Sequence, residues 1–145
     1  MKFINSLLLH YFKPKSFELY RGKPIYEFIG IKLYKKYLPS TGDIMRRWRN
    51  IKQIDIGCKN RIDELYRYER KTRYYEWRHI IGAIILIVLT FFIDRKLTTF
   101  DLIFLAMLNL FVNIYPIFLQ RYNRMRILLT IEKSGNKNPY QTTIV

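Results

Sequence analysis

Two apolar stretches in the second half of the chain decide its fold: IIGAIILIVLTFFI over residues 80–93 and LIFLAMLNLFVNIYPIFL over residues 102–119. Neither stretch contains a charged residue. At about 1.5 Å per residue, a helix made from the second stretch measures about 27 Å, close to the thickness of the hydrocarbon core of a bilayer. The first stretch reaches the lower length limit for a span once the interfacial residues 77–79 are added. The sequence therefore predicts two transmembrane helices, over residues 77–93 and 100–120.

The connection DRKLTTFD, residues 94–101, is polar and short, so the two helices must be antiparallel neighbours. The alternative is a buried helical hairpin of a soluble protein. A surface helix of a soluble protein shows an amphipathic stripe, and residues 80–93 show none. We therefore predict an all-α membrane protein, in which a two-helix transmembrane hairpin (residues 79–126) is accompanied by N-terminal cytoplasmic amphipathic helices.

The positive charge of the chain lies outside the apolar stretches. The net charge is +15, of which residues 1–78 carry +11, residues 79–119 carry none and residues 120–145 carry +4. The positive-inside rule then places both termini in the cytoplasm and the connection outside, so membrane lipids are the expected partners. A basic chain also suits nucleic acid. The long uncharged stretches argue against this class, and so does the lack of zinc-finger, RNA-recognition or basic-zipper patterns.

Residues 1–78 form a basic cytoplasmic or interfacial region. Gly22 and Pro24 mark a turn, and the apolar residues that follow Pro24 recur at helical spacing, with lysines on the other side: Ile25, Phe28, Ile29 and Leu33 against Lys32, Lys35 and Lys36. This pattern predicts an amphipathic helix that lies on an anionic leaflet, packs on the rest of the protein, or does both. The apolar residues 3–12 are too few to span.

The segments that flank the hairpin also have helical patterns. Residues 60–78 carry opposite charges at i,i+4 spacing, which predicts a cytoplasmic helix that runs straight into the first span. Residues 127–145 are predicted to form a short helix to Lys133 and then a flexible cytoplasmic tail.

One face of the second span is polar. Asn109, Asn113, Pro116 and Gln120 are spaced by 4, 3 and 4 residues and therefore share one face of a helix. An amide in hydrocarbon needs a polar partner, so this face should point at protein or at a wet cavity. Two interpretations remain open. Either the polar stripe forms hydrogen bonds that hold helices together, including those of a homo-oligomer, or it lines a substrate site.

Titratable side chains gather at the cytoplasmic ends of the spans. Glu76 and His79 have i,i+3 spacing, and a histidine beside a carboxylate can act as a general base on a hydroxyl, although an interfacial histidine can also be structural. Directly after Gln120 come three guanidinium groups, those of Arg121, Arg124 and Arg126. They suit an anionic head group, and positive-inside anchoring explains them equally.

Several other kinds of site find no support. Cys58 is the only cysteine, so the sequence offers no disulfide framework and no paired metal thiolates. It contains no P-loop, HExxH, GxSxG or dinucleotide glycine motif. No metal and no cofactor is expected.

The residues at the inner ends of the spans carry a resemblance to a known family. EWRH at 76–79, NIYP at 113–116 and QRYNRMR at 120–126 look like the pattern of the glycosyl-4,4'-diaponeurosporenoate acyltransferases, which are small bacterial membrane proteins of carotenoid biosynthesis. Residues 26–31 (YEFIGI), the lysine pair at 35–36 and the dipeptide at 38–39 also fit this pattern. The resemblance extends over about residues 16–130.

The resemblance implies a membrane acyltransferase of the bacterial cell membrane. It would esterify a fatty acyl chain onto a hydroxyl of a glycosylated carotenoid or a similar lipid-linked acceptor, with a lipid-borne donor of unknown identity. By analogy His79 would be the base, helped by Glu76. The groups that would bind donor or sugar are Asn113, Gln120, Arg121, Asn123 and Arg124. The alternative is a non-enzymatic membrane scaffold or subunit that pairs through its Asn109/Asn113 face.

Overall fold

The computed structural model describes residues 10–20, 23–37, 61–92 and 96–140 of the chain. These residues are helical except for loops and one ribbon of two very short strands. In chain order the elements are η1 (Ser16–Glu18), β1 (Leu19–Tyr20), β2 (Lys23–Pro24), η2 (Ile25–Glu27), α2 (Ile31–Tyr37), α4 (Arg61–Phe91), α5 (Thr99–Asn109), η3 (Leu110–Ile114) and α6 (Tyr115–Lys133).

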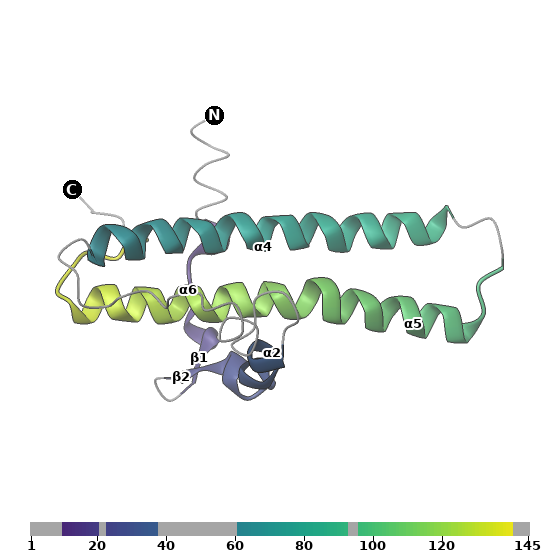
Figure 1. Ribbon diagram of the computed structural model, residues 1–145, viewed down its shortest axis with the longest axis horizontal. Helices are drawn as coiled ribbons and strands as arrows, with labels where there is room; N and C mark the ends of the chain where they lie inside the picture. The colour runs from purple at the N-terminus through teal and green to yellow at the C-terminus, as the bar shows by residue number, and fades with distance from the viewer. Residues whose placement is uncertain (1–9, 21–22, 38–60, 93–95, 141–145) are drawn as a thin grey trace.

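Two long rods dominate the molecule. The first rod is α4, and the second consists of α5, η3 and α6, which follow one another without a gap. The rods lie side by side and run in opposite directions (Figure 1), and α4 packs mainly against α6. Because α4 begins at Arg61, the charged stretch before the first apolar segment belongs to the same helix as that segment, as the sequence predicts.

Local signals at its two ends explain the limits of the second rod. Thr98 and Asp101 form a capping box, in which the Thr98 side chain accepts from the Asp101 N–H and the Asp101 side chain accepts from the Thr98 N–H. At the other end Gly135 adopts a φ of +73°, and the N–H groups of Gly135 and Asn136 bond back to the carbonyls of Glu132 and Ile131. This glycine-based cap ends α6 at Lys133.

The helix expected after Pro24 is divided. Pro24 precedes the short 3₁₀ turn η2, as its fixed φ favours, and α2 begins only after Gly30. Gly30 has a φ of +76°, a conformation that glycine adopts at little cost and that interrupts a right-handed helix. The amphipathic segment is therefore two short elements joined by a glycine instead of one helix.

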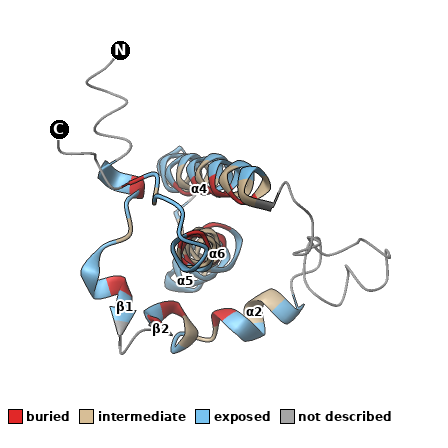
Figure 2. Cartoon of the chain, turned by 90° about the vertical axis from the view of Figure 1, so that its left-hand side faces the viewer, coloured by how far each residue is buried: buried red, intermediate tan, exposed pale blue. Residues whose placement is uncertain are grey.

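Residues 10–20 and 23–37, which we call the N-terminal arm, wrap around α6. The ribbon β1–β2, η2 and α2 lie on the side of α6 that faces away from α4 (Figure 2). The Tyr34 hydroxyl donates to the Phe111 carbonyl at 2.9 Å, and the Tyr115 hydroxyl donates to the Ile29 carbonyl at 3.3 Å. The arm therefore reaches the second rod where its apolar stretch changes into its polar end.

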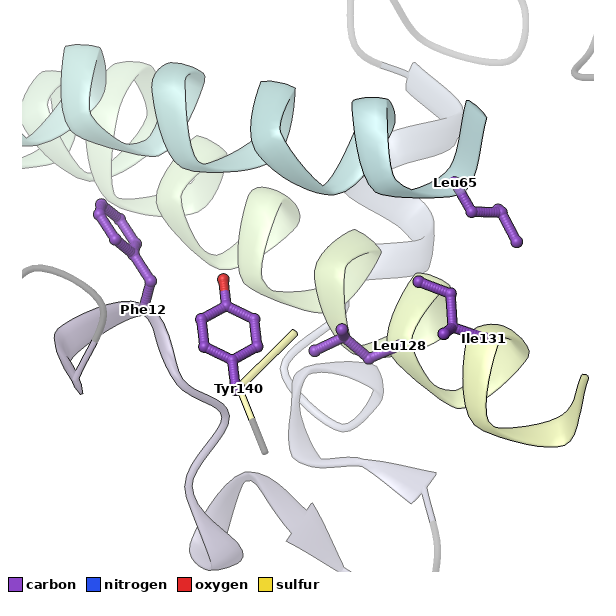
Figure 3. Packing of buried hydrophobic residues seen from close by; sticks show 5 residues of the cluster. All are labelled: Phe12, Leu65, Leu128, Ile131 and Tyr140. Carbon is purple, nitrogen blue, oxygen red and sulfur yellow. The ribbon is translucent and has the colours of Figure 1, made fainter. Parts of the chain in front are cut away.

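An apolar cluster joins the N-terminal arm and the segment that follows α6 to the two rods. Figure 3 shows its members: Phe12 of the arm, Leu65 of α4, Leu128 and Ile131 of α6, and Tyr140. The sequence predicts a flexible tail after residue 133, and in the structure residues 134–140 contact the two rods. Tyr140 is buried, and the Tyr66 hydroxyl donates to the Lys137 carbonyl at 2.6 Å. The cause is a large aromatic side chain that finds an apolar site on the hairpin.

The two rods also carry large exposed apolar side chains over the half that contains the α4–α5 end. They include Ile84, Ile87, Leu89, Phe91, Phe100, Ile103, Phe104 and Val112. Each rod contains an 18-residue window apolar enough to cross a membrane, and only 11% and 22% of these windows are buried. The core helix of a soluble protein would be mostly buried, so lipid is the natural surrounding for this surface.

The molecule therefore has two halves along its long axis. We call the half with residues 77–92 and 96–114 the outer half, and the half with residues 61–76 and 115–140 the inner half. Most of the predicted apolar residues 3–12, and parts of the connection at 94–101, lie outside the described residues.

Candidate functional site

The buried face of α4 changes character along its length. Its buried side chains are Leu65, Glu69, Thr72, Glu76 and Ala83, which recur at intervals of three, four or seven residues. These intervals place them on one seam that faces the second rod. In the inner half this seam carries two carboxylates where an apolar core would be expected. A buried carboxylate needs a charged or hydrogen-bonding partner.

Glu76 is the centre of this polar core, with no exposed surface. One carboxylate oxygen accepts from Arg121 Nε at 2.9 Å, and the other accepts from Arg124 Nη2. Both oxygens of Glu76 are therefore bound by guanidinium groups from α6. Charge-assisted bonds of this kind are about twice as strong as bonds between neutral groups.

Arg124 is as deeply buried as its partner, with 1% of its surface exposed. Its Nε donates to Thr72 Oγ1 at 3.1 Å, and its Nη1 donates to the Phe12 carbonyl at 3.2 Å. Together with the bond to Glu76, all three guanidinium nitrogens have protein acceptors. Arg124 thus ties α6 to α4 and to the N-terminal arm.

Arg121 makes a second connection to the arm. Its Nη1 donates to the carboxylate of Glu18, which is itself buried, and its Nη2 donates to the Tyr11 carbonyl at 2.9 Å. The Tyr26 hydroxyl is a further partner of Glu18. Burial raises the pKa of Tyr26 to about 12, so this hydroxyl keeps its proton and can donate it to the carboxylate.

Glu69 completes the network toward the C-terminal end. Its carboxylate is 3.0 Å from Arg73 Nη2 and 3.8 Å from Arg124 Nε, and it accepts from the Tyr140 hydroxyl. We call these groups the buried charge network: Glu18, Glu69 and Glu76 with Arg73, Arg121 and Arg124. Its three carboxylates are matched by three guanidinium groups, which is the condition for burying charge at tolerable cost.

His79 lies one turn along α4 from Glu76, but the two side chains are used differently. Half-buried His79 interacts with the side chain of Asn113 and with the backbone of Val112. None of the interactions that the structure gives for His79 involves Glu76, whose oxygens face Arg121 and Arg124. The predicted carboxylate–histidine pair is therefore replaced by an amide–histidine pair and a separate ion-pair network.

Asn113 belongs to a chain of amides between the rods. Its Nδ2 donates to Asn109 Oδ1 at 2.8 Å, and Asn109 Nδ2 donates to the Ala83 carbonyl at 3.4 Å. On the far side of Asn113 is Gly82, where a Cβ atom would stand 2.8 Å from Asn113 Oδ1. The polar stripe thus faces α4 of the same chain, and Gly82 leaves the room that Asn113 occupies.

The backbone around Asn113 is irregular. Residues 110–114 form the π-helical segment η3, which interrupts the α-helical rod at the level of His79. Segments of this kind often mark functional sites, because they shift the register of the side chains that follow. Sequence periodicity assumes 3.6 residues per turn throughout, so it could not reveal this shift.

A groove begins beside the amide–histidine pair and runs into the outer half. Its volume is about 280 Å³, and it is lined by Gly82, Ile85, Leu86, Leu89, Leu108, Val112 and Asn113. Asn113, which also bonds to His79, is the only residue of this lining with a polar side chain. The groove is therefore apolar along its length and polar at the end nearest His79.

The predicted site residues fall into two groups. His79 and Asn113 meet at the junction of the halves, whereas Glu76, Arg121 and Arg124 lie in the buried charge network. Gln120 and Asn123 are half-buried on α6, about two and three turns from Asn113. The substrate-binding role of Arg121 and Arg124 stays a prediction, although a bound head group would have to displace protein partners from both guanidinium groups.

Sequence reasoning missed Glu18, Glu69 and Thr72. For two of them a signal existed, because Glu69 and Thr72 lie at 4,3,4 spacing between Leu65 and Glu76. Glu18 gave no such signal, since its partner Arg121 is 103 residues away.

Comparison with known proteins agrees with the resemblance seen in the sequence. The sequence profile of the glycosyl-4,4'-diaponeurosporenoate acyltransferases matches residues 9–133. No curated protein and no solved structure matches the chain. The matched range covers most of the chain, so the chain belongs to this family, whose description is that of an acyltransferase of carotenoid biosynthesis.

Proposed function

We propose that this chain, as a member of the glycosyl-4,4'-diaponeurosporenoate acyltransferase family, moves a fatty acyl chain from an activated ester or thioester onto a sugar hydroxyl of a glycosylated carotenoid. The observation that carries the proposal is the position of the His79–Asn113 pair. His79, whose imidazole can accept a proton, lies where the charged inner half meets the apolar outer half. A reaction between a polar hydroxyl and a membrane-borne acyl group needs a base at such a boundary.

His79 is the proposed general base. The hydroxyl oxygen attacks the acyl carbonyl carbon, a new carbon–oxygen bond forms, and the bond to the leaving group breaks. The hydroxyl proton passes to the imidazole of His79 and then to the leaving group, so that His79 returns to its starting state. A positioned base of this kind contributes about 10²–10⁴-fold to the rate.

Asn113 is the proposed positioning residue. It holds His79 directly, and Asn109 and the Ala83 carbonyl fix the amide in turn. Glu76, Arg121 and Arg124 act one step further away, because their ion pairs hold α4 against α6 and tie the arm to both. Gln120 and Asn123, on the polar side of the junction, are proposed to bind the sugar.

The proposed orientation places the inner half and both termini in the cytoplasm of a bacterial cell, and the outer half in the membrane as a transmembrane hairpin. Exposed Phe17, Phe28 and Leu33 on the arm, with Lys32 beside them, support an arm that rests in the cytoplasmic interface. The acceptor sugar and the donor head group would both be at this level.

A scaffold that pairs through Asn109 and Asn113 is the alternative function. In this structure both amides have partners within the hairpin, so packing of the two rods already explains the stripe without a second chain. Assembly into a homo-oligomer stays a prediction.

The test is to express the chain in a bacterial host that makes the glycosylated carotenoid, and to extract its pigments. Mass spectrometry should detect a species heavier by one fatty acyl group than the acceptor, present only with the gene. Pigment profiles that are identical with and without the gene would contradict the proposed function.

A further inference from the structure

The groove beside His79 suits one part of the two substrates better than the other. It is lined by apolar side chains from both rods and opens along the outer half. Gly82 is three residues from His79 on α4, and Asn113 lines the groove while bonding to His79. The apolar path therefore starts within about one helical turn of the proposed base.

The short distance between the groove and His79 distinguishes the two hydrophobic groups in the reaction, the acyl chain of the donor and the polyene of the acceptor. In an acyl donor, the hydrocarbon chain begins at the reacting carbonyl carbon itself. In a glycosylated carotenoid, the whole sugar separates the reacting hydroxyl from the polyene. A groove that is polar at Asn113, beside His79, and apolar from there onward matches the donor, because the donor's hydrocarbon begins at the reacting carbonyl.

We infer that this groove binds the fatty acyl chain of the donor, with the carbonyl at His79 and Asn113 and the chain running toward Leu89 and Leu108. The inference rests on the proposed function and adds the place of one substrate. From Gly82 to Leu89 the groove follows α4 for about 10 Å. Its volume of about 280 Å³ is near the lower end of the range for ligand pockets, which suits one narrow chain.

The groove should then influence which chain lengths react. Leu86 lies in the middle of the lining and is half-buried between the rods, whereas its neighbour Ile87 is exposed on the outer face and does not line the groove. Leu86→Phe narrows the groove, Leu86→Ala widens it, and Ile87→Phe makes a comparable enlargement outside it. One methylene group in an apolar pocket typically changes discrimination about 10- to 200-fold.

The experiment measures the acyl chains of the product by mass spectrometry. Leu86→Phe should lower the ratio of long to short chains at least about tenfold, and Leu86→Ala should raise it, while Ile87→Phe should match the wild type. An unchanged distribution of acyl chain lengths in both Leu86 variants would overturn the inference. A change in the preferred carotenoid acceptor, without a change in chain length, would also overturn it.

A binding measurement separates this inference from the proposed function. A fatty acyl ester with a photoactivatable group at its chain end is incorporated into vesicles that hold the full chain. Label should concentrate on residues around Leu89 and Leu108, equally in wild type and in His79→Ala, because binding does not need the base. If the label were instead spread uniformly over the exposed surface of the outer half, it would reflect ordinary lipid contact. That result would overturn the inference, whether or not acyl transfer occurs.

Discussion

The inner and outer halves of the hairpin belong to the same two rods but are stabilised in opposite ways. The inner half buries charged side chains, and Glu76 and Arg124 are almost fully buried. The outer half exposes apolar surface, with Phe91 83% and Phe100 76% exposed. The proposed orientation, with water around the inner half and lipid around the outer half, would satisfy both arrangements. The proposed chemistry lies at the level where one surrounding gives way to the other.

The largest expected effect comes from breaking the buried charge network. Glu76→Gln leaves Arg121 and Arg124 without their shared carboxylate, and removing one partner of a buried pair costs about 3–5 kcal/mol. Denaturant unfolding in detergent micelles should record this loss. Asp63→Asn, on an exposed position of the same helix, should stay close to wild type. Equal stability of the two variants would mean that the network does not hold the inner half.

A charge on the outer half should be almost as damaging. Ile84 is 55% exposed, and Lys in its place costs about 2.5–3.5 kcal/mol if the position lies near the middle of a span. Tyr74 in the inner half is 61% exposed, and Tyr74→Lys should change stability by less than about 0.5 kcal/mol. Membrane fractionation of both variants compares the halves directly. A membrane-bound fraction of Ile84→Lys equal to that of Tyr74→Lys would contradict the placement of Ile84 in lipid.

The junction between the halves should respond to one added methyl group. In Gly82→Ala the new Cβ would meet Asn113 Oδ1 at 2.8 Å, so the amide must move away from His79 or Asn109. Overpacking of this kind costs about 1–3 kcal/mol. We expect weaker thermal stability and slower acylation. Ala106→Val, on the exposed face of α5, is the control, and a Gly82→Ala rate that matches it would remove Asn113 from the positioning role.

The smallest effect is expected at the end of the inner half. Tyr140→Phe keeps the ring in its apolar cluster but removes the hydroxyl that donates to Glu69. Loss of one hydrogen bond costs about 0.5–1.5 kcal/mol of stability, and somewhat more when one partner is charged, as Glu69 is. Thermal unfolding should detect a small decrease, whereas Tyr74→Phe, with an exposed ring, should show none. A decrease in stability of several kcal/mol would mean that the tail stabilises the inner half by more than this one hydrogen bond.

The sequence predicts the features that depend on neighbours along the chain. The uncharged runs mark the two apolar segments, the charge pairs at residues 60–78 predict the early start of α4, and the spacing of Asn109 and Asn113 predicts a polar face that needs a partner. Each of these depends on residues within a few turns of one another, where helical geometry fixes the outcome.

The features that the sequence did not reveal depend on distant contacts or irregular backbone. Glu18 and Arg121 meet across 103 positions, and Tyr140 meets Glu69 across 71. The π-helical segment changes the register near Asn113, and Gly30 divides the expected amphipathic helix. The spacing of Glu76 and His79 suggested a pair, but two guanidinium groups compete more strongly for the carboxylate than a neutral imidazole does.

The most direct test of the account is the acylation rate of a His79→Gln variant in lipid nanodiscs, measured beside His10→Gln. The chain has two histidines, and His10 is exposed on the arm, so the pair compares the junction with a site outside it. We predict that His79→Gln lowers the rate at least about 100-fold, as expected for loss of a general base, while His10→Gln keeps it. Equal rates in a folded His79→Gln protein would contradict the central claim.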